Sequence, residues 1–578
     1  MGSSHSYISD PAKFAASVDV DNEREYDYVI IGGGTAGCVL ASRLTESSAT
    51  SVLLIEAGGP QESELLTKIP LGWPKTLKTH LDWNFISTYT TTKWANRKVA
   101  IPRGKVIGGT SSINALIYQH FEQWVNLGAT GWGYKDLLPY FEKSESFTPH
   151  PAYPGIIPEN HGHTGPWQTG LSNESGPVNK AIIDACVELG VKPVGDFNSP
   201  QGCLGVSSFT FTLDGKGQRH SVAKAYLSPS VLERPNLTVA VHTTTEKILF
   251  ENSPSGPRAI GVQLAKSASA QKYRVKAKKE VIICSGAVGT PHLLQVSGLG
   301  PKEDLEKVGV TVVKDLPQVG KHFQDHAAGG PVTIRAKRGW TLDYLNNPIS
   351  GLLALVKWLV NGTGPMSALG VPGAAFIRSD DKSLRFDGKL AGNEPEIRDL
   401  TAGPNSPDLE VMWFPCITGD LSSPPPRGEY GVTIGAIVLK PEGSGTVTLK
   451  SSSIYDNPDI DPNLFESEND YNVAIKGLRF VLRLARTQSM KNVLDVKPHS
   501  TNQSDMFWPG DADPDQTSSA RIGSSPETGV VDASLKVHGV LGLRICDASV
   551  FPSQLSGHPA AVVVAVAEKA ADMLKAAS

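Results

Sequence analysis

The chain has 578 residues, which allows about three or four ordinary domains or one large enzyme with an interrupted second domain. Hydrophobic residues make up 40% of the sequence and charged residues 19%, a balance that excludes a disordered chain and predicts a large buried core. The formal charge of −4 comes from 54 basic and 58 acidic residues, so no nucleic-acid partner is expected.

The N-terminal residues contain no basic start followed by an apolar core, so no secretory signal is predicted. No segment is apolar for long enough to span a membrane. An N-myristoylation pattern begins at Gly2, although so short a pattern arises easily by chance. The six cysteines are scattered without a Cys-x-x-Cys pair, which is typical of small buried side chains. We therefore expect an intracellular, soluble protein without a disulfide framework and without a metal site.

The first strong pattern in the chain is typical of a dinucleotide-binding turn. An apolar strand, a glycine-rich turn and a buried helix are predicted in succession over residues 28–31, 32–37 and 38–44. Gly32 permits the tight turn, Gly34 lets the backbone approach a pyrophosphate, and Gly37 allows helix and strand to pack closely. The N-terminus of the helix would present free N–H groups to the phosphate charge.

An acidic residue follows the second predicted strand, which covers residues 51–55. Glu56 comes 22 residues after Gly34, where a carboxylate accepts hydrogen bonds from an adenosine ribose. The same carboxylate disfavours a 2′-phosphate. Strand, turn, helix and acid together predict a bound dinucleotide, but they do not decide between NAD and FAD.

Two further glycine-rich segments lie at residues 103–114 and 286–300, and the second follows an apolar strand predicted over residues 280–284. Both segments match the two signatures of the glucose-methanol-choline (GMC) flavoprotein oxidoreductases. The chain resembles that family from residue 26 to about residue 574, which is nearly its whole length. The resemblance favours FAD as the dinucleotide.

The resemblance implies an α/β fold with a Rossmann-like FAD-binding domain and an inserted α+β substrate domain built on a largely antiparallel sheet. Both domains are expected to be discontinuous in sequence. The FAD-binding domain would comprise residues 26–70, 95–150, 235–325 and 530–578. The substrate-binding domain would comprise residues 71–94, 151–234 and 326–529, and residues 1–25 would form an N-terminal extension.

The resemblance also implies which residues contact FAD. These are Gly32, Gly34, Thr35, Ala36, Gly37, Glu56, Ala57, Trp83, Arg103, Gly108, Asn114, Thr245, Ser285, Gly286, Asp547, Ala548, Pro559 and Ala560. Thr245 would meet the adenine through its backbone, and Asn114 would lie beside the reactive ring. Some relatives tether FAD through a histidine in the segment that matches residues 111–114, where this chain has Ser112 and Ile113. We therefore predict a non-covalently bound flavin.

Oxidation of an alcohol by a flavin needs a base for the hydroxyl proton and a carbinol C–H aligned with the ring. The resemblance implies that His558 is this base, just before a helix predicted over residues 561–574, and that Asn114 helps to hold the ring. A second catalytic position, usually a histidine in relatives, falls on Asp515. The principal base of the family is therefore missing from this chain.

Three interpretations of that departure stay open. The first is oxidation of a primary, allylic or aromatic alcohol to an aldehyde, with His558 as base and Asp515 as a partner of unknown effect. The second is an atypical reaction that keeps the flavin, such as a lyase reaction or an oxidative rearrangement. The third is a degenerate flavin-binding protein. We favour the first, and the sequence does not decide between an oxidase and a dehydrogenase.

The substrate is expected to be a small molecule. Residues 410–414 are predicted to form a strand of the substrate domain, and they include Trp413 and Phe414. An apolar or aromatic substrate would fit such a surface, but the same side chains are equally typical of an ordinary core. Residues 352–360 are predicted to be helical. No metal is predicted at His322, Asp325 and His326, because relatives carry a similar structural turn there.

Overall fold

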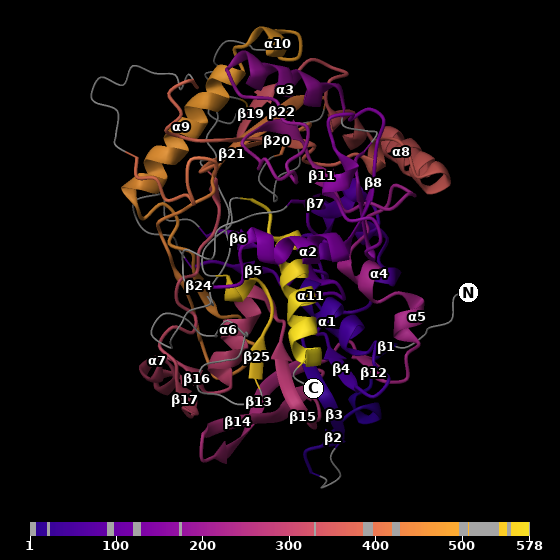
Figure 1. Cartoon of the computed structure of the whole chain (residues 1–578), viewed down its shortest axis with the longest axis vertical. Coiled ribbons are helices and arrows are strands. Elements are labelled where there is room, and N and C mark those ends of the chain that lie inside the picture. Colours follow the sequence, from indigo (N-terminus) through magenta and orange to yellow (C-terminus); the bar gives the residue numbers. More distant parts are fainter. Residues whose placement is uncertain are drawn as a thin grey trace.

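The computed structural model describes most of the chain (Figure 1). The described residues are 7–19, 24–88, 98–119, 129–172, 176–328, 331–384, 397–418, 428–495, 507, 543–551 and 557–576.

A nine-stranded sheet forms the lower half of the molecule in Figure 1. Its path runs through β1 (Tyr7–Ile8), β12 (Leu237–Ala240), β4 (Val52–Ile55), β3 (Glu25–Ile31), β15 (Tyr273–Ile283), β14 (Gly256–Ala265) and β13 (Thr244–Ser253), with β2 (Ala16–Ser17) and β25 (Leu543–Ile545) also on β15. The pairings from β1 through β12, β4 and β3 to β15 and on to β25 are parallel. Strand β4 and the end of β3 are buried runs of Val, Leu and Ile, as expected for parallel strands covered on both faces.

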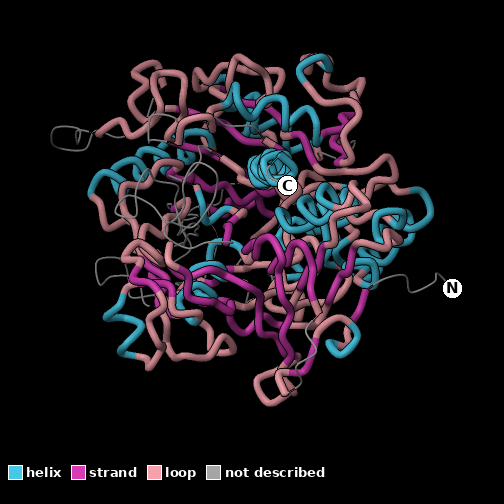
Figure 2. Tube along the Cα trace, turned by 60° about the horizontal axis from the view of Figure 1, so that its bottom comes forward, coloured by secondary structure: helices cyan, strands magenta, loops and turns pink. Residues whose placement is uncertain are grey.

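Helices pack on this sheet through apolar faces. Helix α1 (Thr35–Leu44) contacts α11 (Ala560–Ala576), and α11 also contacts α2 (Tyr134–Ser144). In Figure 2, α11 is seen nearly end-on beside the C label, with strands below it. Helix α6 (Gly286–Val296) follows β15 and packs against β13. The predicted strand-turn-helix units are confirmed, although α1 begins three residues earlier than residue 38.

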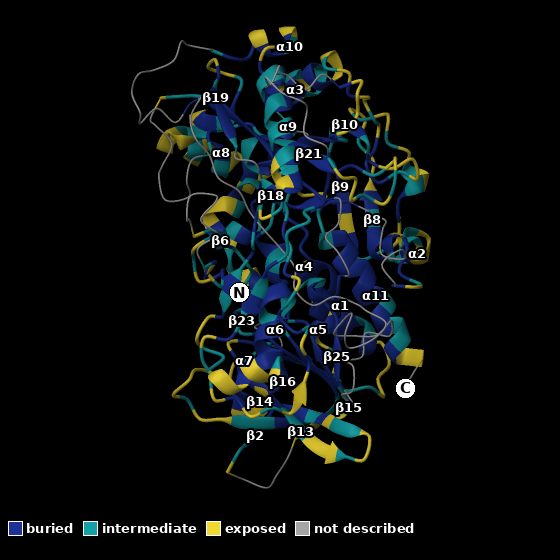
Figure 3. Ribbon diagram, turned by 90° about the vertical axis from the view of Figure 1, so that its left-hand side faces the viewer, coloured by how far each residue is buried: buried dark blue, intermediate teal, exposed yellow. Residues whose placement is uncertain are grey.

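A second, antiparallel sheet of six strands forms the upper half of the molecule. It contains β10 (Gly205–Ser208), β20 (Gly373–Ile377), β21 (Leu409–Phe414), β22 (Gly431–Val438), β18 (Ala327–Ala328) and β19 (Val332–Arg335). Helices α9 (Glu468–Leu484), α3 (Pro177–Glu188) and α10 (Gln488–Lys491) lie beside it, and Figure 3 shows buried strands beneath them. This is the predicted architecture, whereas the residue boundaries of the two domains stay a proposal.

The remaining elements surround these two sheets. The strands are β7 (Ile117–Tyr118), β11 (Thr210–Phe211), β9 (Trp167–Gly170) and β8 (Glu145–Thr148) in a third sheet, and the pairs β5 (Phe85–Ile86) with β6 (Ala100–Ile101), β16 (Leu299–Gly300) with β17 (Lys314–Asp315), and β23 (Thr446–Thr448) with β24 (Asp459–Asp461). The other α-helices are α4 (Val222–Tyr226), α5 (Pro229–Leu232), α7 (Lys302–Lys307) and α8 (Pro348–Asn361). Within the described part of the chain, no helix combines the length and apolar character that crossing a bilayer requires.

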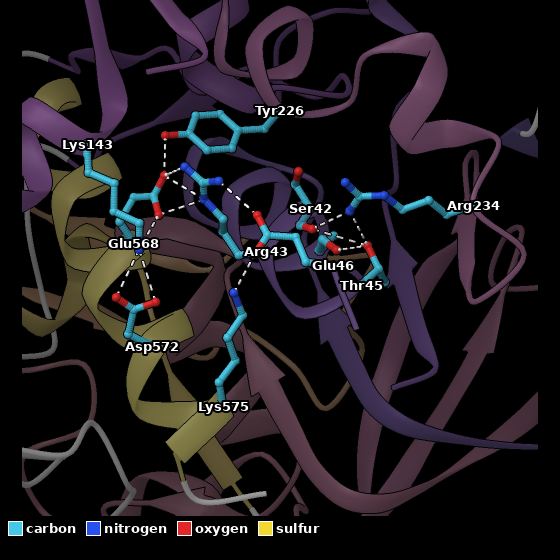
Figure 4. A network of polar contacts seen from close by, with 11 residues as sticks. Ser42, Arg43, Thr45, Glu46, Lys143, Tyr226, Arg234, Glu568, Asp572 and Lys575 are labelled. Carbon is cyan, nitrogen blue, oxygen red and sulfur yellow. Dashed lines mark hydrogen bonds and ion pairs between the residues drawn. The ribbon is translucent and has the colours of Figure 1, made fainter. Parts of the chain in front are cut away.

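A buried ion-pair network joins α11 to α1 (Figure 4). The Glu568 carboxylate is fully buried on α11 and accepts hydrogen bonds from the Arg43 guanidinium at 2.7 to 2.9 Å. The hydroxyl of Tyr226 donates to the same carboxylate at 2.6 Å, and Lys143 Nζ lies 3.4 Å from it. Because a buried carboxylate is stable only when paired, this network fixes the position of α11 relative to α1.

A second buried ionic cluster lies beside the third sheet. The His161 ring is held between Glu145 at 3.0 Å and Asp196 at 2.9 Å, and all three side chains are buried. Burial alone would lower the pKa of His161, but the hydrogen bonds to Asp196 and Glu145 outweigh it and raise the pKa to about 9. The cluster therefore holds a charged imidazole at neutral pH.

Candidate functional site

A cavity of about 620 Å³ lies between the two main sheets. With two exceptions, the residues predicted to contact the cofactor line it, together with His558. These lining residues are Gly32, Gly34, Thr35, Ala36, Glu56, Ala57, Trp83, Arg103, Asn114, Thr245, Ser285, Gly286, Asp547, Ala548, Pro559 and Ala560. Segments separated by hundreds of residues are thus brought to one site.

The two exceptions, Gly37 and Gly108, do not line the cavity and instead support its wall. A Cβ at Gly37 would lie 2.0 Å from the carbonyl oxygen of Gly32, so this glycine is needed for the close packing of α1 on the turn. The backbone of Gly108 has a φ of +89° and donates its N–H to the carbonyl oxygen of Gly33 at 2.7 Å. Gly108 therefore joins the two glycine-rich loops.

The turn between β3 and α1 forms the polar end of the cavity. Gly32 has a φ of +101°, and a Cβ there would lie 2.4 Å from the carbonyl oxygen of Cys284. A Cβ at Gly34 would meet no protein atom closer than 3.7 Å, so the protein itself leaves that side of the backbone open. The free N–H groups of the first turn of α1 begin there, and they suit a pyrophosphate.

Glu56 lies next to this turn at the end of β4. Its carboxylate accepts hydrogen bonds from the N–H groups of Gly33 at 2.9 Å and Gly58 at 2.8 Å. Burial raises the pKa of Glu56 to about 7, although these two N–H groups oppose the rise. Each carboxylate oxygen keeps a second acceptor position, which suits the hydroxyls of an adenosine ribose.

Two further buried polar atoms belong to side chains that line the cavity. Thr245 Oγ1 and His292 Nε2 have no hydrogen-bond partner among the residues described, and both side chains line the cavity. Burial lowers the pKa of His292 to about 4, so its imidazole is neutral. The glycine turn, the carboxylate and these polar atoms together fit the ADP half of FAD. The role predicted for Thr245 concerned its backbone, and no role was predicted for His292.

His558 also lines the cavity, directly before Pro559 and α11. Its Nε2 atom is 3.0 Å from Oε1 of Glu410, whose side chain is 1% exposed. The ring of Phe209 meets the imidazole edge-on, with centroids 5.3 Å apart. These contacts fix the plane of the imidazole. Asp515, the residue predicted at the second catalytic position, lies outside the described residues.

Strand β21 carries Glu410 and part of the apolar wall. Met412 and Phe414 line the cavity, whereas Trp413 points to the opposite face, where its Nε1 donates to Asn179 Oδ1 at 2.9 Å. Trp413 is therefore a core residue and Phe414 a cavity residue. Glu410 was missed because it lies 148 residues from His558 in sequence. The alternation of side chains along the strand was the available signal, since it puts residues 410, 412 and 414 on one face.

All six cysteines are free thiols, and five of them are buried. In the described segments, no group of three or more His, Cys, Asp or Glu side chains is arranged to hold a metal ion.

Comparison with known proteins agrees with this geometry. Two family models, both described as GMC oxidoreductase, match residues 26–328 and 441–567. The chain is 43% identical to dehydrogenase str4 of Strobilurus tenacellus over the full length of both proteins. It is 32% identical to the mitochondrial choline dehydrogenase of Homo sapiens, a match that covers 98% of this chain and 92% of that protein.

Solved structures give the same result. A formate oxidase of Aspergillus oryzae, solved in a study of FAD modification, matches with a TM-score of 0.85 and 25% identity over 96% of this chain and 99% of that one. A fungal aryl-alcohol oxidase matches with a TM-score of 0.77 and 25% identity over the same shares. GMC oxidoreductases use FAD. The chain is therefore an oxidoreductase that belongs to the GMC oxidoreductase family.

Proposed function

We propose that the chain oxidises a primary, allylic or aromatic alcohol to the aldehyde, with FAD in the cavity and His558 as the base. The observation that carries the proposal is that His558, Asn114 and the glycine turn at Gly34 line one cavity. FAD bound there would supply the acceptor for the hydride that leaves the carbinol carbon.

The protein would supply the group that accepts the hydroxyl proton and would hold that group in place. The contact between Glu410 and His558 Nε2 holds the imidazole ring and leaves Nδ1 as the nitrogen that can take the hydroxyl proton. Glu410, as a hydrogen-bond acceptor, favours the tautomer with the ring proton on Nε2. Asn114 contributes to the wall of the same cavity and would help to hold the ring.

The substrate class follows from the apolar part of the wall. Met412, Phe414 and Ile437 line the cavity on the side of the antiparallel sheet. Such a surface favours a small apolar or aromatic alcohol over a sugar, because a sugar would leave several hydroxyls without partners.

We further propose that the flavin is bound non-covalently. In the segment where some relatives carry the tethering histidine, Ser112 is buried with its hydroxyl donating to the carbonyl of Ile107 at 3.0 Å, and Ile113 is buried in an apolar cluster. Acid precipitation should therefore release the yellow chromophore into the supernatant. A yellow pellet would contradict this part of the proposal.

Asp515 falls where relatives usually have a catalytic histidine. We propose that the missing histidine limits the rate at which alcohol reduces the flavin. Replacing Asp515 with His should raise the rate of flavin reduction by alcohol. No gain in that measurement would favour the atypical reaction left open by the sequence.

The proposed function is tested by incubating FAD-loaded protein with a panel of benzylic, allylic and aliphatic alcohols and measuring the aldehyde formed. Stoichiometric aldehyde with consumption of oxygen or of an added acceptor supports oxidation. Product formation that consumes neither oxidant would show a redox-neutral reaction and overturn the proposal, as would the absence of aldehyde from every alcohol in the panel.

A further inference from the structure

A buried arginine lies behind the cavity wall, beside Asn114. Arg219 is 1% exposed and lies between β11 and α4. One of its terminal nitrogens donates to the carbonyl oxygen of Ser111 at 3.1 Å and to Asn114 Oδ1 at 2.7 Å. The other donates to the backbone carbonyl of Asn114 at 2.7 Å. The guanidinium is thus held by the loop that lines the cavity.

The charge of Arg219 is not balanced by a neighbouring carboxylate in the described part of the chain. Arg544, another buried arginine, pairs with Glu280, and Arg43 pairs with Glu568. Arg219 contacts only carbonyl and amide oxygens, and its Nε has no partner among described groups. Burial accordingly lowers the pKa of Arg219 to about 9. An isolated buried charge is costly, so a negative group nearby would stabilise it.

The same contacts fix the side chain of Asn114. Its Oδ1 atom accepts a hydrogen bond from Arg219 and a second from the backbone N–H of Leu116 at 3.1 Å. Because both of these groups are donors, the amide atom that they contact must be the oxygen. The amide nitrogen is left over, and Asn114 lines the cavity. The wall therefore offers a hydrogen-bond donor at this point.

We propose that Arg219 is a positioning residue for the flavin: it holds Asn114 with its amide nitrogen free for the ring, and it supplies the buried positive charge that stabilises the reduced cofactor. This inference depends on the proposed function. In that reaction the hydroxyl proton goes to His558 Nδ1, and the hydride takes two electrons and one negative charge to the flavin while the carbonyl product is left. A fixed positive charge favours the side of the equilibrium with that added negative charge.

The test is the two-electron midpoint potential of the FAD-loaded protein, measured against a reference dye during slow reduction by xanthine and xanthine oxidase. In Arg219→Gln, the equilibrium constant for flavin reduction should fall at least tenfold, which is a potential lower by about 30 mV. Arg219→Lys keeps the charge only while its amine is protonated, and burial lowers the pKa of a lysine. At a pH below that lowered pKa, its equilibrium constant should stay within about threefold of that of the wild type.

Arg234 offers a matched control at the far end of α1. Among the described residues, its guanidinium likewise contacts a carbonyl and a hydroxyl, those of Ser42 and Thr45, at 2.6 and 3.0 Å (Figure 4). Arg234→Gln removes similar hydrogen bonds and should leave the potential unchanged. An unchanged potential in Arg219→Gln with FAD bound would overturn the inference.

If Arg219→Gln does not retain FAD, the potential of Arg219→Lys tests the inference instead. A tenfold fall in the equilibrium constant for flavin reduction, with the lysine still charged, would also overturn the inference. The reductant contains no alcohol, so a chain that fails to oxidise alcohols still gives a valid potential. That failure would contradict the proposed function alone. A wild-type chain that binds no flavin would overturn both.

Discussion

Replacing Glu568 with Gln tests whether the network in Figure 4 fixes α11 in place. The substitution keeps the shape of the side chain but removes the charge that pairs with Arg43 and Lys143 and weakens the acceptor for Tyr226. Breaking a buried ion pair by removing one partner costs about 3–5 kcal/mol. The hydroxyl of Tyr226 belongs to the same network, so the free energy of its hydrogen bond is not simply added to that of the ion pair. We expect a loss of about 3–5 kcal/mol in the free energy of unfolding.

The assay is urea denaturation of the FAD-loaded protein, followed by far-ultraviolet circular dichroism and by the release of flavin fluorescence. Lys575→Gln is the matched control, because it removes an ion pair between α11 and Glu46, which lies just after the end of α1. The side chains of Lys575 and Glu46 are 35% and 39% exposed. Exposed pairs contribute about 0–1 kcal/mol. A Glu568 variant that loses no more stability than this control would show that the buried network does not fix α11 in place.

Three further predictions concern the cofactor end and the second buried cluster. Gly34→Ala should be as stable as the wild type, because its Cβ meets no atom closer than 3.7 Å. It should bind FAD at least about tenfold more weakly in a fluorescence titration, and wild-type affinity would contradict the assignment of this turn to the pyrophosphate. FAD affinity should rise as the pH rises through about 7, since Glu56 must ionise to accept from the ribose, and Glu56→Gln should remove this dependence. The pKa of His161 is raised in the folded state, so its contribution to stability is complete below its ordinary pKa of 6.5 and is lost as the pH rises through about 9. Glu145→Gln should flatten the dependence of the melting temperature on pH between about pH 6 and about pH 10, and an unflattened profile would exclude a charged His161.

Local patterns were enough to predict the strand, turn and acidic residue that line part of the cavity. The strand before Gly32, the turn and the acid at Glu56 all lie within about 30 residues, where spacing alone constrains the geometry. The start of α1 was placed too late, because glycines are poor helix formers. In the fold, Gly37 nevertheless lies in the first turn of α1, since only a residue without a side chain fits against the carbonyl oxygen of Gly32.

Contacts between distant segments were beyond the reach of sequence patterns. Glu410 meets His558 only because β21 of the antiparallel sheet lies against the start of α11, and no motif links the two residues. Similarly, Arg219 gave no signal in the sequence, since its significance depends on burial and on which carbonyl groups surround it. Strand alternation separates Phe414 from Trp413 only when it is known which face of the sheet meets the cavity.

The most direct test of the central claim is the anaerobic reduction of bound flavin by alcohol in the wild type and in His558→Ala. We expect rapid bleaching of the flavin absorbance in the wild type and a rate at least about 100-fold lower in the variant, because loss of a general base usually lowers a rate by at least this factor. Equal bleaching rates, with FAD bound equally well by both proteins, would contradict the assignment of His558 as the base.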